Sequence, residues 1–202
     1  MSFQTFFAIA MFAFVSSITP GPNNLMLLTS GVNFGFRPTI PHMLGISFGF
    51  GLLVMSVGLG LAQVFQTFPI AYAIMKWVGV AYMVYLAWAI ANAGGLNLSK
   101  ASKKSTLKPM TFFGAAAFQW VNPKAWVMAV GVFSTFLPGQ SSLLVVLMVA
   151  GIFCAINLPS VSIWALFGAR LRDAFESPQF RRLFNYVMAG LLLLSLAPIF
   201  LT

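Results

Sequence analysis

Apolar residues along this chain form long stretches that are separated by short polar segments. Six stretches have the length of about 20 residues that a helix needs to cross the hydrocarbon core of a bilayer. They lack the period-two alternation of membrane β-strands. The sequence therefore predicts an all-α integral membrane protein with six transmembrane helices, at about residues 5–30, 43–62, 70–92, 111–136, 143–168 and 184–201.

Composition supports this class of protein. Of the 202 residues, 60% are hydrophobic and 6% are charged, which leaves too little polar surface for a water-soluble domain of this length. The six segments also leave almost no chain for a soluble domain. We therefore expect one transmembrane domain over residues 1–202, with halves at about 1–95 and 110–202 and a basic cytoplasmic loop at 96–109.

The net charge of +9 could suggest a nucleic-acid partner, but the positions of the charges argue against one. Basic residues gather in the loops after the first, third and fifth segments. The positive-inside rule places these loops in the cytoplasm and both termini outside. Contact with anionic membrane lipid is a second role for these residues. They are Arg37, Lys100, Lys103, Lys104, Lys108, Arg170, Arg172, Arg181 and Arg182.

A polar break lies inside the first apolar segment, where Thr19-Pro20-Gly21-Pro22-Asn23-Asn24 interrupts the helical pattern. The prolines remove backbone donors, and several backbone groups lose their helical partners at a depth where no water can replace them. Such backbone is tolerated when it faces protein or a water-filled cavity. The break therefore predicts a binding site near the middle of the membrane.

The fourth segment has a matching break at Asn122-Pro123-Lys124. Three spans followed by three spans make the fourth cross in the opposite sense to the first, which permits two inverted three-helix repeats. Transporters with such repeats often build their site from paired discontinuous helices. We therefore expect the two breaks to lie together.

Broken helices suit a small zwitterion. A half-helix N-terminus offers free amides to a carboxylate, a C-terminal end offers carbonyls to an ammonium group, and Asn side chains add donors and acceptors. In the alternative interpretation, the breaks are proline kinks whose Asn side chains only repair backbone bonds. The candidate substrate-binding residues are Pro20, Gly21, Pro22, Asn23, Asn24, Asn122, Pro123 and Lys124.

Lys124 carries an ammonium group near a helix centre, where insertion costs about 2.5 kcal/mol or more without a partner. It can snorkel, bond to carbonyls and Asn side chains, become neutral, or meet a ligand carboxylate. The only acids of the chain, Asp173 and Glu176, follow the fifth segment. A cationic substrate side chain would therefore find no counter-charge within the spans, so neutral amino acids are favoured.

Three further features are less specific. His42 is expected to be an interfacial residue, with a proton carrier as the alternative. The Gly45/Gly49 pair predicts close helix packing, within the chain or with a second copy. The polar interruption at residues 157–160 fits either a pathway lining or a plain kink.

These motifs together resemble the LysE/RhtB family of bacterial amino-acid exporters over essentially the whole chain. The resemblance rests on the blocks Thr19 to Asn24, Gly35-Phe36-Arg37, Gly45 to Gly49, Gly79 to Tyr82 and Asn122-Pro123-Lys124. The Asn23-Asn24 pair and the run Phe118 to Asn122 look most like the branch that exports cysteine and O-acetylserine.

The resemblance implies a multi-pass secondary carrier of the bacterial inner membrane, with both termini in the periplasm. Such a carrier exports small neutral amino acids, such as cysteine, O-acetylserine, threonine or homoserine, and uses the proton gradient. The resemblance leaves a homo-oligomer open, and no metal or cofactor is expected. An enzyme would need a nucleophile with a base, a metal cluster or paired acids at membrane depth, and the spans lack these sets. A membrane assembly protein and a channel-like pore remain the alternatives.

Overall fold

A computed structural model describes residues 1–92, 108–139, 141–174 and 177–197 of the chain. Regular structure in these ranges is helical throughout, which confirms the all-α prediction for the described part of the chain. In chain order the helices are α1 (Phe3–Ile18), α2 (Pro22–Phe34), α3 (Phe36–Ser56), the π-helical turn η1 (Val57–Leu61), α4 (Ala62–Thr67), α5 (Pro69–Asn92), α6 (Phe112–Phe118), the 3₁₀ turn η2 (Gln119–Val121), α7 (Pro123–Phe136), α8 (Leu143–Ala174) and α9 (Pro178–Leu194).

Three helical stretches in the described residues are long and apolar enough to cross a membrane: Phe36–Leu61, Ala73–Asn92 and Leu143–Arg172. A fourth span results if α1 and α2, which are bent by 51° at their break, cross as one unit. Many large apolar side chains point outward, among them Phe3 and Phe113, each 81% exposed. Such a surface is unfavourable in water and suits lipid. The protein is therefore a multi-pass membrane protein.

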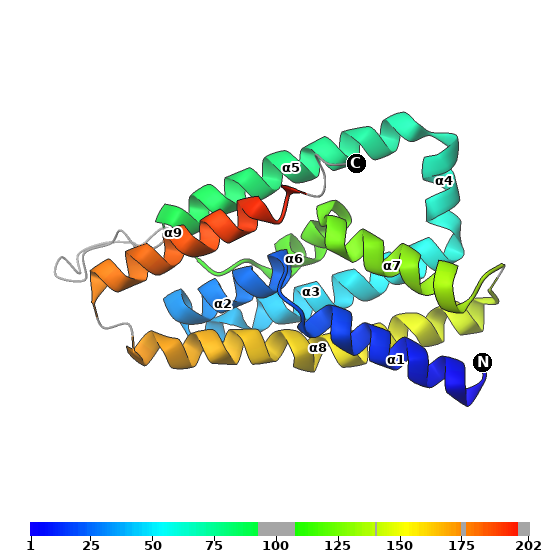
Figure 1. The fold of residues 1–202 in the computed structure, drawn as a ribbon, viewed down its shortest axis with the longest axis horizontal. Coiled ribbons are helices and arrows are strands. Elements are labelled where there is room, and N and C mark those ends of the chain that lie inside the picture. The colour runs from blue at the N-terminus through cyan, green and yellow to red at the C-terminus, as the bar shows by residue number, and fades with distance from the viewer. Residues whose placement is uncertain (93–107, 140, 175–176, 198–202) are drawn as a thin grey trace.

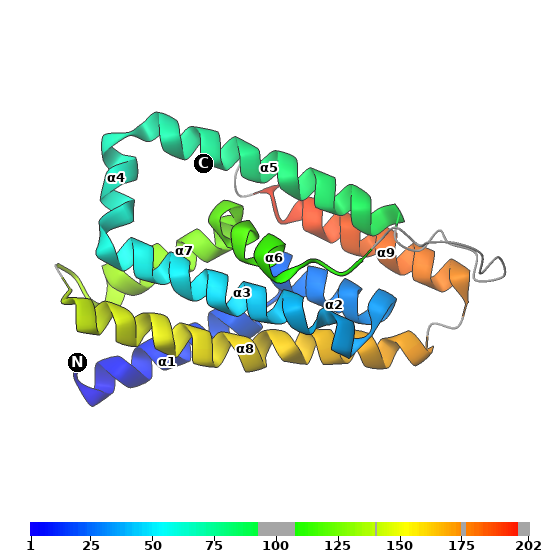
Figure 2. The same ribbon diagram turned by 180° about the vertical axis from the view of Figure 1, so that it is seen from behind.

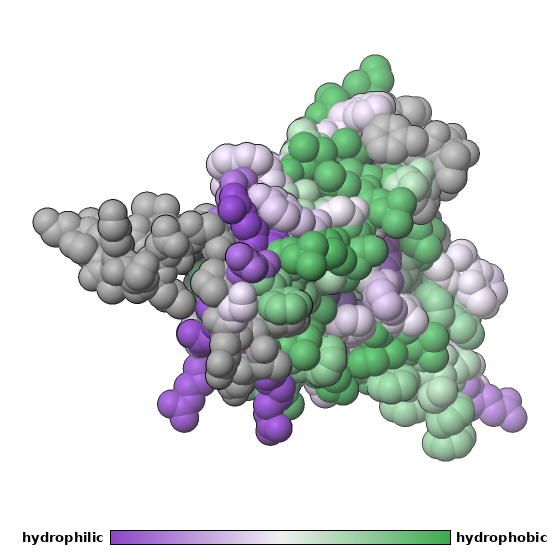
Figure 3. Space-filling model, turned by 60° about the vertical axis from the view of Figure 1, so that its left-hand side comes forward, coloured by the Kyte–Doolittle hydropathy of each residue, from purple (hydrophilic) through white to green (hydrophobic). Residues whose placement is uncertain are grey.

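Most of the helices run roughly along one axis, and the short helix α4 crosses it (Figure 1). Helix α8 packs against α1, α2 and α3, while α5 and α9 pair with each other on one side (Figures 1 and 2). The largest core cluster joins α1, α3, α7 and α8 through residues such as Ile9, Phe50, Ala129 and Phe153. Figure 3 shows an outer face on which hydrophobic side chains cover broad areas and hydrophilic side chains gather in separate groups.

Glycines allow the closest helix contacts. A Cβ at Gly45 would collide with the carbonyl oxygen of Phe112 and lie 2.8 Å from Cβ of Ala115, and a Cβ at Gly49 would lie 2.5 Å from Cα of Ala116. Side chains at these positions would force α3 and α6 apart. The predicted close packing of the glycine pair is thus confirmed, and it lies within the chain.

Proline positions explain both helix breaks. Pro22 and Pro123 occupy the first turns of α2 and α7, where the missing N–H would have had no helical partner. Gly35, with φ of 86°, makes the turn from α2 to α3, a conformation that few other residues adopt readily. Consequently α3 begins at Phe36, seven residues before the predicted start of the second apolar segment.

The basic residues of the described chain gather mainly at one end of the molecule. The α2–α3 turn, the C-terminal part of α8 and the start of α9 lie together at that end (Figure 1). These segments carry Arg37, Arg170, Arg172, Arg181 and Arg182. Most of the predicted basic loop at 96–109, with Lys100, Lys103 and Lys104, lies outside the described residues, as does Glu176.

Candidate functional site

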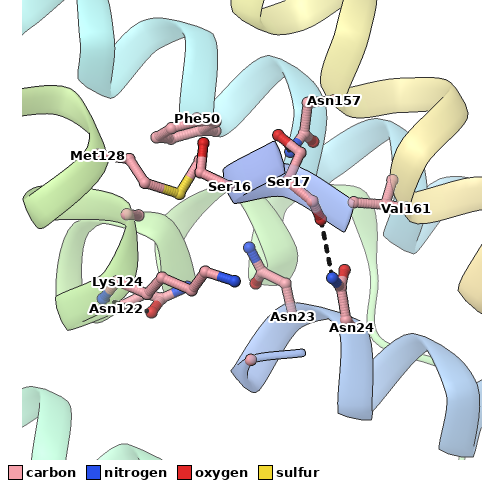
Figure 4. Close-up of a pocket in the computed structure, with 12 residues that line it drawn as sticks. Ser16, Ser17, Asn23, Asn24, Phe50, Asn122, Lys124, Met128, Asn157 and Val161 are labelled. Carbon is pink, nitrogen blue, oxygen red and sulfur yellow. Dashed lines mark hydrogen bonds between the residues drawn. The ribbon is translucent and has the colours of Figure 1, made fainter. Parts of the chain in front are cut away.

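The two helix breaks meet in space through Lys124. Its Nζ donates to the carbonyl oxygen of Thr19 at 2.9 Å, to the Thr19 hydroxyl at 3.0 Å and to the carbonyl oxygen of Pro20 at 3.2 Å. Residues about 105 positions apart are thereby joined across a pocket, into which the Lys124 side chain extends toward Asn23 (Figure 4). Of the roles considered for Lys124, bonding to backbone carbonyls is the one that the structure contains.

The backbone carbonyl groups at the C-terminal end of α1 accept hydrogen bonds from side chains of three other helices. Asn24 Nδ2 donates to the carbonyl oxygens of Ser17 and Thr19, each at 2.8 Å. Trp164 Nε1 donates to the carbonyl oxygen of Ile18 at 3.0 Å. Because a helix C-terminus carries partial negative charge, it is a favourable place for the ammonium group of Lys124. The same position would suit the ammonium group of an amino acid.

The N-terminus of α2 is open by comparison. Its cap residue is Gly21, and no side chain caps the helix. In α7, by contrast, Asn122 caps the helix by accepting from the Lys124 backbone N–H at 3.1 Å. First-turn amides without a cap and the positive end of a helix dipole favour an anion. The pocket therefore has an end suited to a carboxylate close to the end suited to an ammonium group.

Asn23 and Gln119 hold the two breaks in register. Asn23 Nδ2 donates to Gln119 Oε1 at 2.8 Å, and Gln119 Nε2 donates back to Asn23 Oδ1 at 3.1 Å. Gln119 is fully buried, and its Nε2 also donates to the carbonyl oxygen of Ala115 at 2.9 Å. Two reciprocal amide bonds in a buried place fix the relative position of α2 and η2.

The pocket is narrow, with a cavity volume of about 20 Å³. Five of the eight predicted site residues line it: Gly21, Asn23, Asn24, Asn122 and Lys124. Pro20, Pro22 and Pro123 are not among the lining residues. These prolines shape the breaks instead, although the Pro20 carbonyl oxygen accepts from Lys124.

Other polar lining residues were not singled out from the sequence as binding residues. Ser16 and Ser17 come from the last turns of α1. Asn157 of α8 donates to Ser17 Oγ at 3.1 Å and accepts from Ser47 Oγ at 3.0 Å. In the sequence, the polar interruption at residues 157–160 was the feature that could have indicated Asn157 as a lining residue. Helix α8 continues through Pro159. The pathway-lining interpretation of Asn157 therefore fits the structure.

One atom of the pocket has no partner within the described residues. Asn24 Oδ1 is buried and accepts no hydrogen bond there, although the Asn24 amide nitrogen donates twice. A buried acceptor left unpaired costs about 1–3 kcal/mol. A donor supplied by a bound molecule would remove that cost, and an ammonium group is such a donor.

Comparisons with known proteins show what this chain is similar to. A family model described as LysE type translocator matches residues 14–202. The chain is 34% identical over 193 residues to proteins named cysteine/O-acetylserine efflux protein from Escherichia coli strain K12 and from Shigella flexneri serotype 5b, strain 8401. Each alignment covers 94% of this chain and 94% of the relative. No solved structure matches the chain.

Proposed function

Because the chain belongs to the LysE type translocator family, we propose that it is a secondary carrier that exports small neutral amino acids or their derivatives, such as cysteine, O-acetylserine, threonine or homoserine. Membership in this family places the chain among transporters and not among enzymes. The observation that carries the proposal is the bonding of Lys124 to the broken end of α1, since it places a cation and a helix C-terminus together at the pocket.

Substrate binding is an exchange of partners in this proposal. The substrate ammonium group replaces the Lys124 ammonium at the Thr19 and Pro20 carbonyls and also donates to Asn24 Oδ1. The freed Lys124 and the first-turn amides of α2 then bind the substrate carboxylate. Every charged group keeps a partner before and after the exchange, which keeps the barrier low in a medium of low polarity. Because the bonds of Lys124 join α1 to α7, their exchange couples occupancy to the relative position of the two broken helices.

Selectivity for neutral side chains is the first prediction. Proteoliposomes with the purified protein should transport O-acetylserine, cysteine, serine, threonine or homoserine faster than lysine or arginine, because no lining residue of the pocket is acidic and a cationic side chain would lack a counter-charge. Radiolabelled counterflow measures this. Faster transport of lysine or arginine would contradict the proposed substrate class, and a lack of saturable counterflow would favour a channel-like pore.

Coupling to the proton gradient belongs to the same proposal. The sequence has no Asp or Glu in the predicted spans, so a carboxylate relay is not available within them. A proton can be carried by Lys124, by His42 or by the substrate itself. The same proteoliposomes, compared with and without an imposed pH gradient, test the coupling.

We also propose that the chain forms six spans as two inverted repeats. Broken helices α1–α2 and α6–α7 run in opposite directions along the long axis, as do α3 and α8, and α5 and α9 (Figures 1 and 2). Helix α1 packs on α8, and α6 packs on α3, which is the exchange of partners that a two-fold relation requires. The opposite helix directions and these matching contacts support the proposed inverted repeat.

Orientation in the bacterial inner membrane gives the second prediction. In a Cys154→Ala background, a cysteine placed at Arg170 should react with an impermeant maleimide only in inside-out vesicles, because the basic end faces the cytoplasm. A cysteine placed at Ser2 should react in intact spheroplasts. Both side chains are exposed at the helix ends they mark. Labelling of the Arg170 position in spheroplasts would reverse the proposed orientation.

A further inference from the structure

A second cavity lies between α2, α3, α5 and the segment before α6, toward the basic end of the molecule. Its cavity volume is about 320 Å³. Its polar lining residues include Thr29, Ser30, Asn33, His42 and Lys108. None of these was predicted as a substrate-binding residue.

His42 is the central feature of this cavity. Its side chain is 2% exposed, and neither ring nitrogen has a hydrogen-bond partner among the described residues. The sequence placed His42 at the cytoplasmic start of the second span. In the structure it lies in the second turn of α3, which begins at Phe36, and its side chain is buried among neighbouring helices. A buried, unpaired polar group is costly, so the ring points to an occupant that donates or accepts a hydrogen bond.

Three other polar lining residues, Thr29, Ser30 and Asn33, are already paired. Thr29 Oγ1 donates to the carbonyl oxygen of Leu25 at 2.8 Å, and the Ser30 and Thr39 hydroxyls bond to each other at 2.8 Å. Asn33 Nδ2 donates to the Thr29 carbonyl oxygen at 2.9 Å and to Asn185 Oδ1 at 3.0 Å. These groups form a fixed polar wall. His42 is the buried lining residue whose ring nitrogens have no partner among the described residues, and a neutral imidazole has one hydrogen-bond donor and one acceptor.

Helix α2 connects this cavity to the central pocket. Asn23 lines the central pocket, and Met26, Ser30 and Asn33 line the second cavity. Positions 23, 26, 30 and 33 follow the helical repeat and lie on one face of α2. At 1.5 Å per residue this face extends about 15 Å from the central pocket toward the basic end.

We propose that the second cavity is a loading site, which binds the zwitterionic amino acid on the cytoplasmic side before it moves along α2 to the central pocket. Lys108, whose side chain is exposed and lines the cavity, attracts the carboxylate, and the His42 ring bonds to a polar group of the substrate. A lipid acyl chain is a poor occupant of a cavity with His42, Ser30 and Asn33 in its wall, because it would leave His42 unpaired. The inference rests on the proposed export of a small amino acid.

The test distinguishes an effect on substrate binding at the cytoplasmic face, measured as KM, from an effect on the transport rate, measured as Vmax. In inside-out vesicles, saturable uptake of O-acetyl-L-[14C]serine gives KM and Vmax for entry from the cytoplasmic face. His42→Phe keeps the ring volume and removes both nitrogens, and it should raise KM about tenfold with Vmax within about twofold of wild type, as expected for one lost hydrogen bond to a charged group. A fall in Vmax with unchanged KM would instead assign His42 to proton transfer and overturn the loading site. Lys108→Met should raise KM in the same way, whereas Arg170→Gln, an exposed cation outside the cavity lining, should not.

Equilibrium binding of the same labelled compound to detergent-purified protein provides the second measurement. Lys124→Met protein should retain binding at the loading site, and adding His42→Phe should weaken it about tenfold. Unchanged KM in both folded variants, or unchanged binding in the double variant, overturns the loading site while the carrier function stands. A phospholipid that copurifies with wild type and is lost in His42→Phe, with KM unchanged, would identify a lipid site instead. Wild-type protein that neither transports nor binds the compound overturns both proposals.

Discussion

Replacing Lys124 with Met is expected to lower amino-acid export about 100-fold or more while the protein still folds. Met keeps the length of the aliphatic chain but removes the ammonium group that bonds to Thr19 and Pro20. In the proposed exchange, the same ammonium group binds the substrate carboxylate, and the loss of a charge-assisted bond costs about 1.5–3 kcal/mol, or roughly 10–100-fold. Loss of the link between α1 and α7 adds to this effect. Initial rates of counterflow in proteoliposomes measure it.

Lys76→Met is the matched control for this substitution. Lys76 is a half-buried cation on α5 that does not line the central pocket, so its loss should leave export within about twofold of wild type. Elution of both variants as single symmetrical peaks in size-exclusion chromatography would establish that they are folded. Normal export by folded Lys124→Met would contradict the carrier site and favour the interpretation that the breaks only shape the helices of an assembly protein.

The sequence was sufficient to locate both helix breaks, because each depends on local chemistry. Proline in a helix interior and amide side chains in an apolar segment have a physical cost wherever they occur. Their pairing could be inferred from the matched positions in the two halves of the chain. The bonding between Lys124 and Thr19 could not be, since it depends on how α7 docks against α1 over a separation of 105 residues.

Other contributions to the site depend on tertiary packing alone. Asn157 joins the pocket because α8 stays helical through Pro159 and brings that side chain to Ser17 and Ser47. His42 is buried because neighbouring helices pack against α3, whose first turns precede the predicted apolar segment. The pattern of apolar residues indicates where lipid contact begins rather than where a helix begins. It therefore does not predict polar first turns, such as that of α3, as part of the helix.

The second large effect is expected in stability rather than in transport. Gly45→Ala should lower the free energy of unfolding by about 2 kcal/mol, because the added Cβ collides with the Phe112 carbonyl oxygen and lies 2.8 Å from Cβ of Ala115. Backbone cannot move aside as a flexible side chain can, so α3 and α6 must separate. For a chain of this length the midpoint of thermal unfolding should fall by about 4–8 °C. A fluorescence melt of the detergent-purified protein measures the change.

Gly151→Ala separates this collision from the ordinary effect of replacing glycine in a helix. Gly151 lies inside α8, and a Cβ at that position has no heavy atom within 4 Å. Alanine there should keep or raise the melting temperature, since it is the better helix former by about 1 kcal/mol. The two substitutions are chemically identical, so opposite shifts can only reflect what surrounds each glycine. If Gly45→Ala instead changed the oligomeric state without lowering stability, the glycine pair would belong to an interface between copies and not to the α3–α6 contact.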